Sequence, residues 1–445
     1  MGNNISYQQT PVELSLGDKG KIRGLQFDGK SRRFTGVPYA LPPTGEHRWR
    51  KPRPLPTSYS YSDGSGGAYD ATKFKPVCPQ KAFHVGKSDG KGATHSEDCL
   101  FVNIWTPVRK DGEEEKEKKW PVKLWIHGGW FQMGDPSQEP GMDATELIAT
   151  GGLNAIVVAI GYRLNVFGFL AGEDLLRESD GEAGGNFGLW DQRVAAEWVR
   201  DHISYFGGDP ENITLAGRSA GAYSAEAQML YDFRKPGNTS SLFRRIFMVS
   251  NAIPAQPKSL ADVRGQFDEL CEYFQIQTSL PGPEKLAALR DISSDDLVRA
   301  IPHLKNHTFR PVTDDIFVHS GMIEYLQSRE FADEFKTRGY KILIGEVRNE
   351  ETLYSSYNSP TEPSIDALKL QVSNYYAPQV TDRAIQQYKL PASDKLEDWQ
   401  RTFGYKLGTT SIDQMKVMTP EAKIEIRSDE RWEELLKLGR IFAGN

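Results

Sequence analysis

The stretch ITLAGRSAG, residues 213–221, joins a strand-forming run to a Gly-x-Ser-x-Gly turn, and a helix-compatible run, Ala220–Leu230, follows it. The flanking glycines let the backbone turn tightly between strand and helix, and such a turn exposes the serine hydroxyl. The five-residue pattern alone is a weak signal in a chain with 41 glycines. Its place between a β-branched strand and a helix predicts that Ser219 is a nucleophile, and an ordinary glycine turn is the alternative.

Short apolar segments alternate with amphipathic stretches through most of the sequence. Several of the apolar segments have no polar face, as strands covered on both sides should be. The clearest helical periodicity lies in Leu189–His202. This alternation predicts one α/β domain with a mainly parallel sheet and flanking helices. The expected strands are Phe101–Thr106, Val122–Ile126, Ala155–Ile160, Ile213–Ala216, Ile246–Val249 and Ile342–Ile344.

A second glycine-rich turn, His127-Gly128-Gly129-Trp130, closes the strand candidate upstream of the serine. Its backbone N–H groups and that of Ala220 are suited to bind a developing oxyanion. The N–H of Trp130 is a further candidate donor, and its indole would narrow the site. We expect His127 to be a structural residue at the end of a strand and not a base.

The acid candidate is Glu350, which follows the strand candidate Ile342–Ile344. Its neighbour Glu351 is an alternative, and either could be a solvated loop carboxylate. This order of parts is that of an α/β-hydrolase, whose triad runs serine, acid, histidine along the chain. All eight histidines precede Glu350, so the general base is missing from its expected place; they are His47, His84, His95, His127, His202, His303, His307 and His319.

Composition limits the remaining function classes. The net charge of −6 argues against a nucleic-acid surface. No apolar run reaches the length of a spanning helix, and the N-terminus lacks the features of a secretory signal. With only three cysteines, the chain is expected to be cytoplasmic and mostly reduced. Gly2 to Ser6 fit a loose N-myristoylation pattern. We expect neither a cofactor nor a metal.

Many ordered blocks besides these motifs resemble the type-B carboxylesterase family, the cholinesterase-like branch of the α/β-hydrolases, and specifically its fungal members. The resemblance extends from about Val12 to Tyr354. Its blocks include Phe34–Ala40, Ser96–Leu100, Tyr162–Leu164, Asn186–Gln192, Phe206–Pro210, Pro311–Asp314 and Gly345–Glu351.

The resemblance implies a serine acyl-enzyme mechanism on a small-molecule ester. It makes Ser219 the nucleophile and Glu350 the triad acid, and it places Gly128, Gly129 and Ala220 in the oxyanion hole. Two positions depart from the family pattern. Arg218 stands where many relatives have glutamate, and Glu351 stands where many have glycine.

Several structural contacts are also implied by the resemblance. Cys78 and Cys99 occupy the positions of the family's first disulfide and should lie within bonding reach, whereas Cys271 should have no cysteine partner. Two buried or half-buried ion pairs are expected to hold loops beside the sheet, namely Arg48 with Glu97 and Arg163 with Asp191.

The end of the chain resembles the family's closing segment, which here begins at Gly408. Relatives carry a long block before that segment, and the block contains the catalytic histidine and further strands. Here Trp399–Gly404 is followed almost at once by the closing segment. We therefore expect residues 1–445 to form one α/β-hydrolase domain with an internal deletion near 403–405, through exon skipping or an error in the annotated gene. The sheet edge beyond Ile342–Ile344 should be truncated.

Three functional hypotheses remain. The first is a carboxylic-ester hydrolase with impaired activity, because a serine without its imidazole is a poor nucleophile. The second is a non-catalytic binding protein of the cholinesterase-like kind. The third is a truncated gene model of an active esterase. A binding protein often loses its serine or its oxyanion glycines, and Ser219, Gly128 and Gly129 are all present. Their presence favours descent from an active hydrolase.

Overall fold

The parallel centre of a ten-stranded sheet organises the molecule, in the order β1-β2-β3-β5-β7-β6-β8-β9-β10 with β4 paired to β2. The structure is a computed structural model that describes residues 7–81, 94–108, 119–136, 143–235, 241–345, 350–387, 390–408, 415–418 and 424–427. The side chains of residues 350–352, 387 and 405 onwards are also outside this description. The acylation pattern at Gly2 and the ring of His84 therefore lie outside the described residues.

The strands divide into an antiparallel and a parallel part. The parallel part contains, in order across the sheet, β7, β6, β8, β9 and β10. The antiparallel part contains β1, β2, β3 and β5, and β5 pairs antiparallel with β7, where the two parts meet. The bounds are β1 Gln9–Ser15, β2 Lys21–Phe27, β3 Ser31–Pro38, β4 Tyr69–Asp70, β5 Phe101–Pro107, β6 Trp120–Ile126, β7 Ile156–Ile160, β8 Gly208–Arg218, β9 Arg245–Val249, β10 Lys341–Gly345, β11 Met415–Met418 and β12 Ile424–Arg427.

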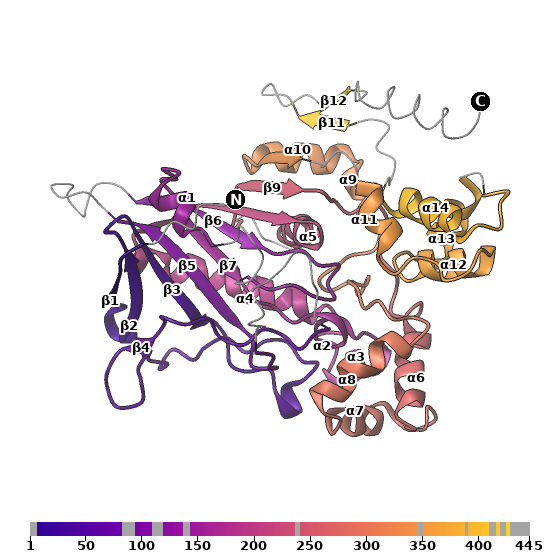
Figure 1. Cartoon of the computed structure of the whole chain (residues 1–445), viewed down its shortest axis with the longest axis horizontal. Helices are drawn as coiled ribbons and strands as arrows, with labels where there is room; N and C mark the ends of the chain where they lie inside the picture. Colours follow the sequence, from indigo (N-terminus) through magenta and orange to yellow (C-terminus); the bar gives the residue numbers. More distant parts are fainter. Residues whose placement is uncertain are drawn as a thin grey trace.

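Helices flank the sheet and gather at one end of the molecule (Figure 1), where α12, α13 and α14 lie together, opposite to β1–β3. Their bounds are α1 Thr145–Ala149, α2 Asn165–Phe169, α3 Glu173–Glu178, α4 Phe187–His202, α5 Ala220–Arg234, α6 Arg264–Tyr273, α7 Gly282–Arg290, α8 Ser294–Ala300, α9 Met322–Leu326, α10 Arg329–Thr337, α11 Glu350–Ser356, α12 Ile365–Ser373, α13 Pro378–Gln387 and α14 Leu396–Gly408. No helix in the described ranges is long and apolar enough to cross a bilayer.

The α/β-hydrolase fold predicted from the sequence is confirmed. All six expected strands are present, and the helix expected over Leu189–His202 is α4, which begins at Phe187. The largest difference is β8, which extends back to Gly208. β7 is buried throughout, because helices cover both faces of the central sheet.

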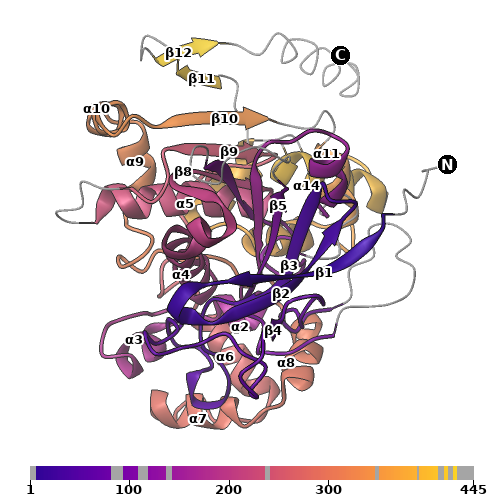
Figure 2. The same ribbon diagram turned by 90° about the vertical axis from the view of Figure 1, so that its left-hand side faces the viewer.

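One edge of the ten-stranded sheet is formed by β10, which is drawn above β9 in Figure 2. In the described part of the chain β10 pairs only with β9, and β11 and β12 form a separate two-stranded sheet. Two apolar side chains of β10 are largely open to solvent, with Leu343 62% and Ile344 48% exposed. Exposed apolar edge strands are sites of intermolecular pairing.

The predicted pair between Arg163 and Asp191 is confirmed. Nε and Nη2 of Arg163 lie 2.8 and 2.7 Å from the two Asp191 oxygens, and the Arg163 backbone N–H also donates to Oδ2 at 3.0 Å. Both residues are buried, with Asp191 fully excluded from solvent. The pair ties the segment after β7 to helix α4, and its bidentate geometry suits the planar guanidinium.

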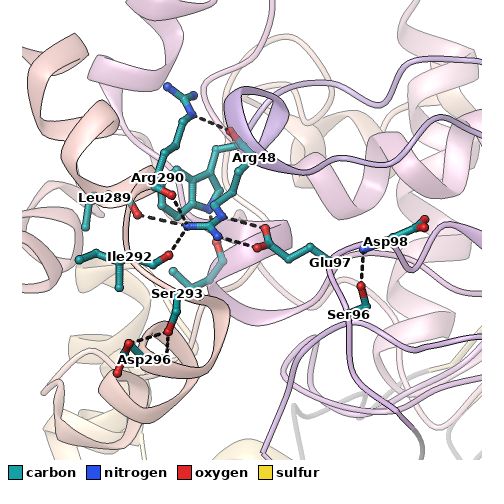
Figure 3. A network of polar contacts seen from close by, with 11 residues as sticks. Arg48, Ser96, Glu97, Asp98, Leu289, Arg290, Ile292, Ser293 and Asp296 are labelled. Carbon is teal, nitrogen blue, oxygen red and sulfur yellow. Dashed lines mark hydrogen bonds and ion pairs between the residues drawn. The ribbon is translucent and has the colours of Figure 1, made fainter.

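The predicted pair between Arg48 and Glu97 is also confirmed (Figure 3). The guanidinium contacts both oxygens of Glu97, at 2.8 Å from Nε and 2.5 Å from Nη2. Its Nη1 donates to the carbonyls of Leu289, Arg290 and Ile292 at the end of α7. A cation at a helix C-terminus satisfies carbonyls that have no intrahelical donor. Arg48 therefore joins the N-terminal loops to α7.

Side-chain capping by Ser293 explains where helix α8 begins. In Figure 3 the hydroxyl of Ser293 lies beside Asp296, and it accepts the backbone N–H of Asp296 at 3.1 Å. Ser328 and Ser364 cap α10 and α12 in the same way. Such caps satisfy N–H groups of the first helical turn and stabilise the helix start by about 1 kcal/mol.

The predicted proximity of Cys78 and Cys99 is confirmed. The Cys78 thiol lies beside that of Cys99, and this neighbour together with burial raises the pKa of the Cys99 thiol. Cys78 Sγ also accepts the Leu164 backbone N–H at 3.2 Å. Cys271 is buried and free, as expected.

Removing one member of the buried ion pair should destabilise the fold strongly. Arg163→Met leaves the Asp191 carboxylate buried without its partner, and we expect the free energy of unfolding in urea to fall by about 3–5 kcal/mol. Arg163→Met combined with Asp191→Asn should recover part of the loss. The control is Arg177→Met, which removes an exposed pair with Glu173 and should cost less than about 1 kcal/mol. Equal losses in the two single variants would contradict this account.

Candidate active site

Ser219 occupies the turn between β8 and α5. Its backbone has φ 55° and ψ −120°, a conformation that non-glycine residues rarely adopt. β8 ends at Arg218 and α5 begins at Ala220, so the strand–turn–helix order predicted from the sequence is present. The Ser219 N–H donates to the Val249 carbonyl at 2.8 Å, which ties the turn to the end of β9.

The glycines of this turn are required because other backbone atoms occupy the space of a side chain. A Cβ on Gly217 would lie 2.2 Å from the Gly221 carbonyl carbon, and a Cβ on Gly221 would lie 2.0 Å from the Ile126 oxygen. Neither contact is sterically possible. The second contact brings α5 directly against the end of β6.

The His127–Trp130 turn lies beside the serine. A Cβ on Gly128 would lie 3.1 Å from Ser219 Cβ, so the two backbones are in close contact. Gly129 has φ 110°, and its carbonyl accepts the N–H groups of Gln132 and Met133 at 2.8 and 3.1 Å. The structure thus brings Gly128 and Gly129 together with Ser219 and Ala220.

The amide donors of this turn are available to a ligand. Within the described residues, the N–H groups of Gly128, Gly129 and Ala220 have no protein acceptor. The first N–H groups of a helix lack intrahelical acceptors, and the α5 dipole also favours negative charge at Ala220. Donors of this kind beside a nucleophile are suited to stabilise a tetrahedral oxyanion.

Trp130 forms an aromatic wall of the site. Its ring stacks on Tyr357 at 4.0 Å between centroids and lies edge-on to Tyr354 at 6.2 Å. Trp130 and Phe131 both have positive φ, 57° and 66°. Two consecutive non-glycine residues in this region store backbone strain, which is typical of functional turns.

Glu350 is the first residue of α11, close after β10, and its side chain lies outside the described residues, as does that of Glu351. The end of β10 nevertheless lies near the serine. The Gly345 carbonyl accepts the Ser250 N–H at 2.7 Å, and Ser250 follows directly after β9. The carboxyl ends of β8, β9 and β10 are therefore adjacent.

The described histidines contact other parts of the molecule. His127 is 1% exposed, its Nδ1 lies 2.8 Å from the Gly128 oxygen, and its ring stacks on Tyr162 at 4.5 Å. This matches the structural role expected for it. The rings of four others contact Glu46 (His47), Trp198 (His202), Tyr273 (His303) and Gln371 with Thr308 (His307). The backbone of His95 pairs with Val77, and the His319 carbonyl accepts the Gln256 side-chain amide at 3.0 Å.

An open pocket adjoins Ser219. Among the described residues, its lining contains neither a histidine nor a carboxylate. It does contain Lys258, Arg310 and Tyr375, which sequence reasoning did not identify. The only signal in the sequence was the position of Arg310, directly before the block Pro311–Asp314.

Glu226 is a buried acid on α5 beneath the loop that follows β9. Its Oε2 accepts the Ile253 N–H at 2.6 Å. Burial raises the pKa of this carboxyl to about 7, and the hydrogen bond from Ile253 offsets part of that rise. Sequence reasoning missed it, because a glutamate within a helical run ordinarily faces solvent.

Comparisons with known proteins agree with this geometry. The model of the carboxylesterase family matches residues 8–418. An uncharacterised esterase/lipase of Schizosaccharomyces pombe is 40% identical over 396 residues, which cover 87% of this chain and 70% of the relative. A carboxylic ester hydrolase of Gibberella moniliformis is 37% identical, with 90% and 73% covered. A solved thermophilic PNB esterase has a TM-score of 0.69 at 27% identity, covering 89% of this chain and 76% of that one.

The raised pKa of Glu226 predicts a pH-dependent stability. The carboxyl has a pKa of about 7 in the folded chain, against an ordinary value of 4.5, so folding favours its protonated form. Its stabilising contribution is complete below pH 4.5 and is lost as pH rises through 7. Glu226→Gln keeps an acceptor for the Ile253 N–H. At about pH 8 we expect its free energy of unfolding to exceed that of the wild type by up to about 3 kcal/mol, and at about pH 4.5 we expect little difference.

The measurement is urea unfolding at both pH values. Glu146→Gln, which changes an exposed glutamate on α1, controls for the loss of a carboxylate in general. If the difference in the free energy of unfolding between Glu226→Gln and the wild type does not grow with pH, the Glu226 carboxyl is solvated and this account is wrong.

Proposed function

Because the chain belongs to the carboxylesterase family, we propose that it is a carboxylic-ester hydrolase that acts through an acyl-enzyme on Ser219. The Ser219 oxygen attacks the ester carbonyl carbon, the alcohol departs with the serine proton, and water then releases the acid. Glu350 is the triad acid of this proposal. The observation that carries it is Ser219 at φ 55° in a turn packed against Gly128.

The oxyanion role rests on three amides. Gly128, Gly129 and Ala220 each keep an N–H without a protein acceptor in the described structure, and all lie beside Ser219. As the carbonyl becomes tetrahedral, its oxygen gains negative charge that these donors stabilise without reorganising. Each such donor contributes about 3–4 kcal/mol in serine hydrolases.

We propose further that hydrolysis by this chain is impaired. Every histidine precedes Glu350 in the sequence, and no histidine lines the pocket among the described residues. Without an imidazole in the described lining, the Ser219 proton has no histidine to carry it to the departing alcohol as the new bond forms. Loss of a triad member leaves about 10³–10⁴-fold catalysis over water, from the oxyanion hole and from binding.

An internal deletion accounts for the missing base. We propose that residues 1–445 form one domain from which a block near 403–405 is absent. β10 is open on both faces, since the consecutive residues Leu343 and Ile344 point to opposite sides of the sheet and both are exposed, and among the described strands it pairs only with β9. This supports the proposal, because further strands would pair with the free edge of β10 and their connections would cover its faces. The cytoplasmic location expected from the sequence belongs to the same proposal.

A non-catalytic binding protein is the alternative function. It is favoured by the same lack of a base, and it needs no reactive serine. The retained strain at Ser219 and the open oxyanion donors favour the hydrolase, because a binding scaffold gains nothing from either. Chemical reactivity of Ser219 therefore separates the two functions.

The purified chain should hydrolyse 4-nitrophenyl butyrate at no more than a trace rate, because the serine lacks its base. An alkyl fluorophosphonate should nevertheless label Ser219 slowly, since the oxyanion donors remain. Mass spectrometry locates the label, and Ser219→Ala should lose both label and residual turnover. Gly128→Ala disturbs the oxyanion turn and should slow labelling in a chain that keeps Ser219.

Two outcomes would contradict the proposal. Complete absence of labelling under prolonged exposure would favour the binding protein. A burst followed by fast steady hydrolysis, abolished by Ser219→Ala, would require a substitute base. Single replacements of His127, His303, His307 and His319 would then identify it.

The deletion has its own test. We expect transcripts of the locus to include a longer form that inserts a block between the codons of Phe403 and Tyr405 and restores a histidine. The protein translated from that form should turn over 4-nitrophenyl butyrate at least about 10²-fold faster, since a general base typically supplies about 10²–10⁴-fold. If only the 445-residue form is transcribed, the explanation by an error in the annotated gene fails.

A further inference from the structure

Two cationic side chains, Lys258 and Arg310, line the pocket that contains Ser219. They come from separate segments, one after β9 and the other between α8 and α9. The chain as a whole has a net charge of −6. Two cations beside the nucleophile of an acidic protein are not explained by its average charge.

The backbone on either side of Arg310 is held rigidly. The Gln132 side-chain amide bonds to both backbone groups of Phe309, accepting its N–H at 3.1 Å and donating to its carbonyl. The Asn186 amide makes the matching pair with Val312, at 2.9 Å in each direction. Gln132 also donates its own N–H to Gly129, so Arg310 is fixed relative to the oxyanion turn.

Aromatic rings position the Arg310 guanidinium within the pocket. Its central carbon lies 5.2, 5.4 and 5.9 Å from the ring centroids of Tyr375, Phe131 and Tyr223. Tyr223 donates its N–H to the Ser219 carbonyl at 3.0 Å. Arg310 therefore rests on a ring one helical turn from the nucleophile. Ring faces attract a cation but leave the guanidinium N–H edge able to donate.

Lys258 is tied to the same segment. Its carbonyl accepts the Thr313 N–H at 2.7 Å, and the Thr313 hydroxyl donates to the Pro257 carbonyl at 2.9 Å. Burial lowers the pKa of Lys258 to about 8, with the nearby charge of Arg310 as a second cause, whereas Asp262 opposes the shift. The ammonium is thus partly desolvated and close enough to Arg310 to be repelled by it.

No carboxylate neutralises these charges within the described side chains. Neither Lys258 nor Arg310 forms an ion pair there, although Asp262 influences Lys258. Asp262 accepts both the N–H and the hydroxyl of Ser259, at 2.9 and 2.8 Å, which holds it on its own turn. Juxtaposed like charges without a counter-ion are unfavourable for the fold, and such arrangements mark sites that bind a ligand of opposite charge.

Tyr375 adds an independent observation. Its hydroxyl is buried and has no hydrogen-bond partner in the described structure, yet the residue lines the pocket beside Arg310. A buried hydroxyl normally finds an acceptor, because leaving it unpaired costs about 1–3 kcal/mol. A bound anion would supply that acceptor and would contact both cations.

We propose that this pocket selects esters that carry a carboxylate, which Lys258 and Arg310 bind with the Tyr375 hydroxyl as a third donor. Arginine binds a carboxylate through two parallel hydrogen bonds, and the lysine adds a point charge. The ester carbonyl of the same molecule then lies toward Ser219 and the oxyanion turn. This inference names the substrate class for the proposed hydrolase and rests on that function.

Binding tests the proposal without requiring turnover. The probes are monobenzyl glutarate, which carries a carboxylate, and the neutral benzyl methyl glutarate. Calorimetric titration into the full-length Ser219→Ala chain at about pH 7 should show the half-ester binding at least about tenfold more tightly, as expected for charge-assisted hydrogen bonds. Raising the salt concentration should reduce this preference, because salt screens accessible charges.

Three further variants assign the preference to the pocket. Arg310→Met keeps contact with the aromatic rings and should remove most of the preference, as should Lys258→Met, while Arg310→Lys should retain part of it. Arg264→Met is the matched control, because Arg264 is 79% exposed at its side chain and lies next to the pocket residue Val263 without lining the pocket. Its preference should equal that of the parent.

The outcomes separate this proposal from the hydrolase function. The carboxylate proposal is overturned if the two probes bind with equal affinity. It is also overturned if Arg310→Met and Lys258→Met both keep the preference for the half-ester, or if Arg264→Met loses the preference as much as they do. Preferential binding in a chain whose Ser219 never reacts with the fluorophosphonate would support the carboxylate site and refute the hydrolase. Labelling of Ser219 without any preference would refute only the carboxylate site.

Discussion

The site depends on one close backbone contact, between Gly221 at the start of α5 and the Ile126 carbonyl at the end of β6. There is no space for a side chain at Gly221, since its Cβ would lie 2.0 Å from that oxygen. The contact fixes the helix that follows Ser219 against the strand that precedes the Gly128 turn. Ser219 and the amides of Gly128 and Ala220 are therefore parts of one rigid unit, which is the preorganisation that the proposed oxyanion hole requires.

Charge is used in opposite ways in the frame and in the pocket. Arg163 and Arg48 each meet a carboxylate in bidentate geometry, so their burial joins distant segments without leaving a net charge. Among the described residues, Arg310 instead lies against aromatic rings, and its charge acts on the nearby Lys258. The pocket therefore keeps two like charges close together, whereas each of the two structural arginines is neutralised by a carboxylate. This pattern is expected where a ligand supplies the opposite charge.

The sequence predicted the parallel half of the sheet and the serine turn, because apolar β-branched runs and paired glycines leave local signals. It did not predict β1 and β2, in which many positions are exposed or half-buried and polar residues are frequent. It also did not predict β3, which is mostly buried but begins with the polar run Ser31–Arg33. The contact between Lys258 and the Arg310 segment was also not predictable. It depends on the pairing of Ser259 with Thr313, and no local pattern encodes a contact between separate loops.

The strain at Ser219 bears on the proposal that a block of the chain was deleted. A non-glycine residue at φ 55° costs about 1–3 kcal/mol, which surrounding packing must offset. Trp130 and Phe131 add two more such residues on the facing turn. A scaffold selected only for binding would be more stable with this strain relieved, and the open amides of Gly128 and Ala220 would serve no purpose in it. Strained turns that face one another around unpaired donors suit catalysis, and so they favour the proposed deletion from a working esterase over the alternative of a scaffold adapted to binding.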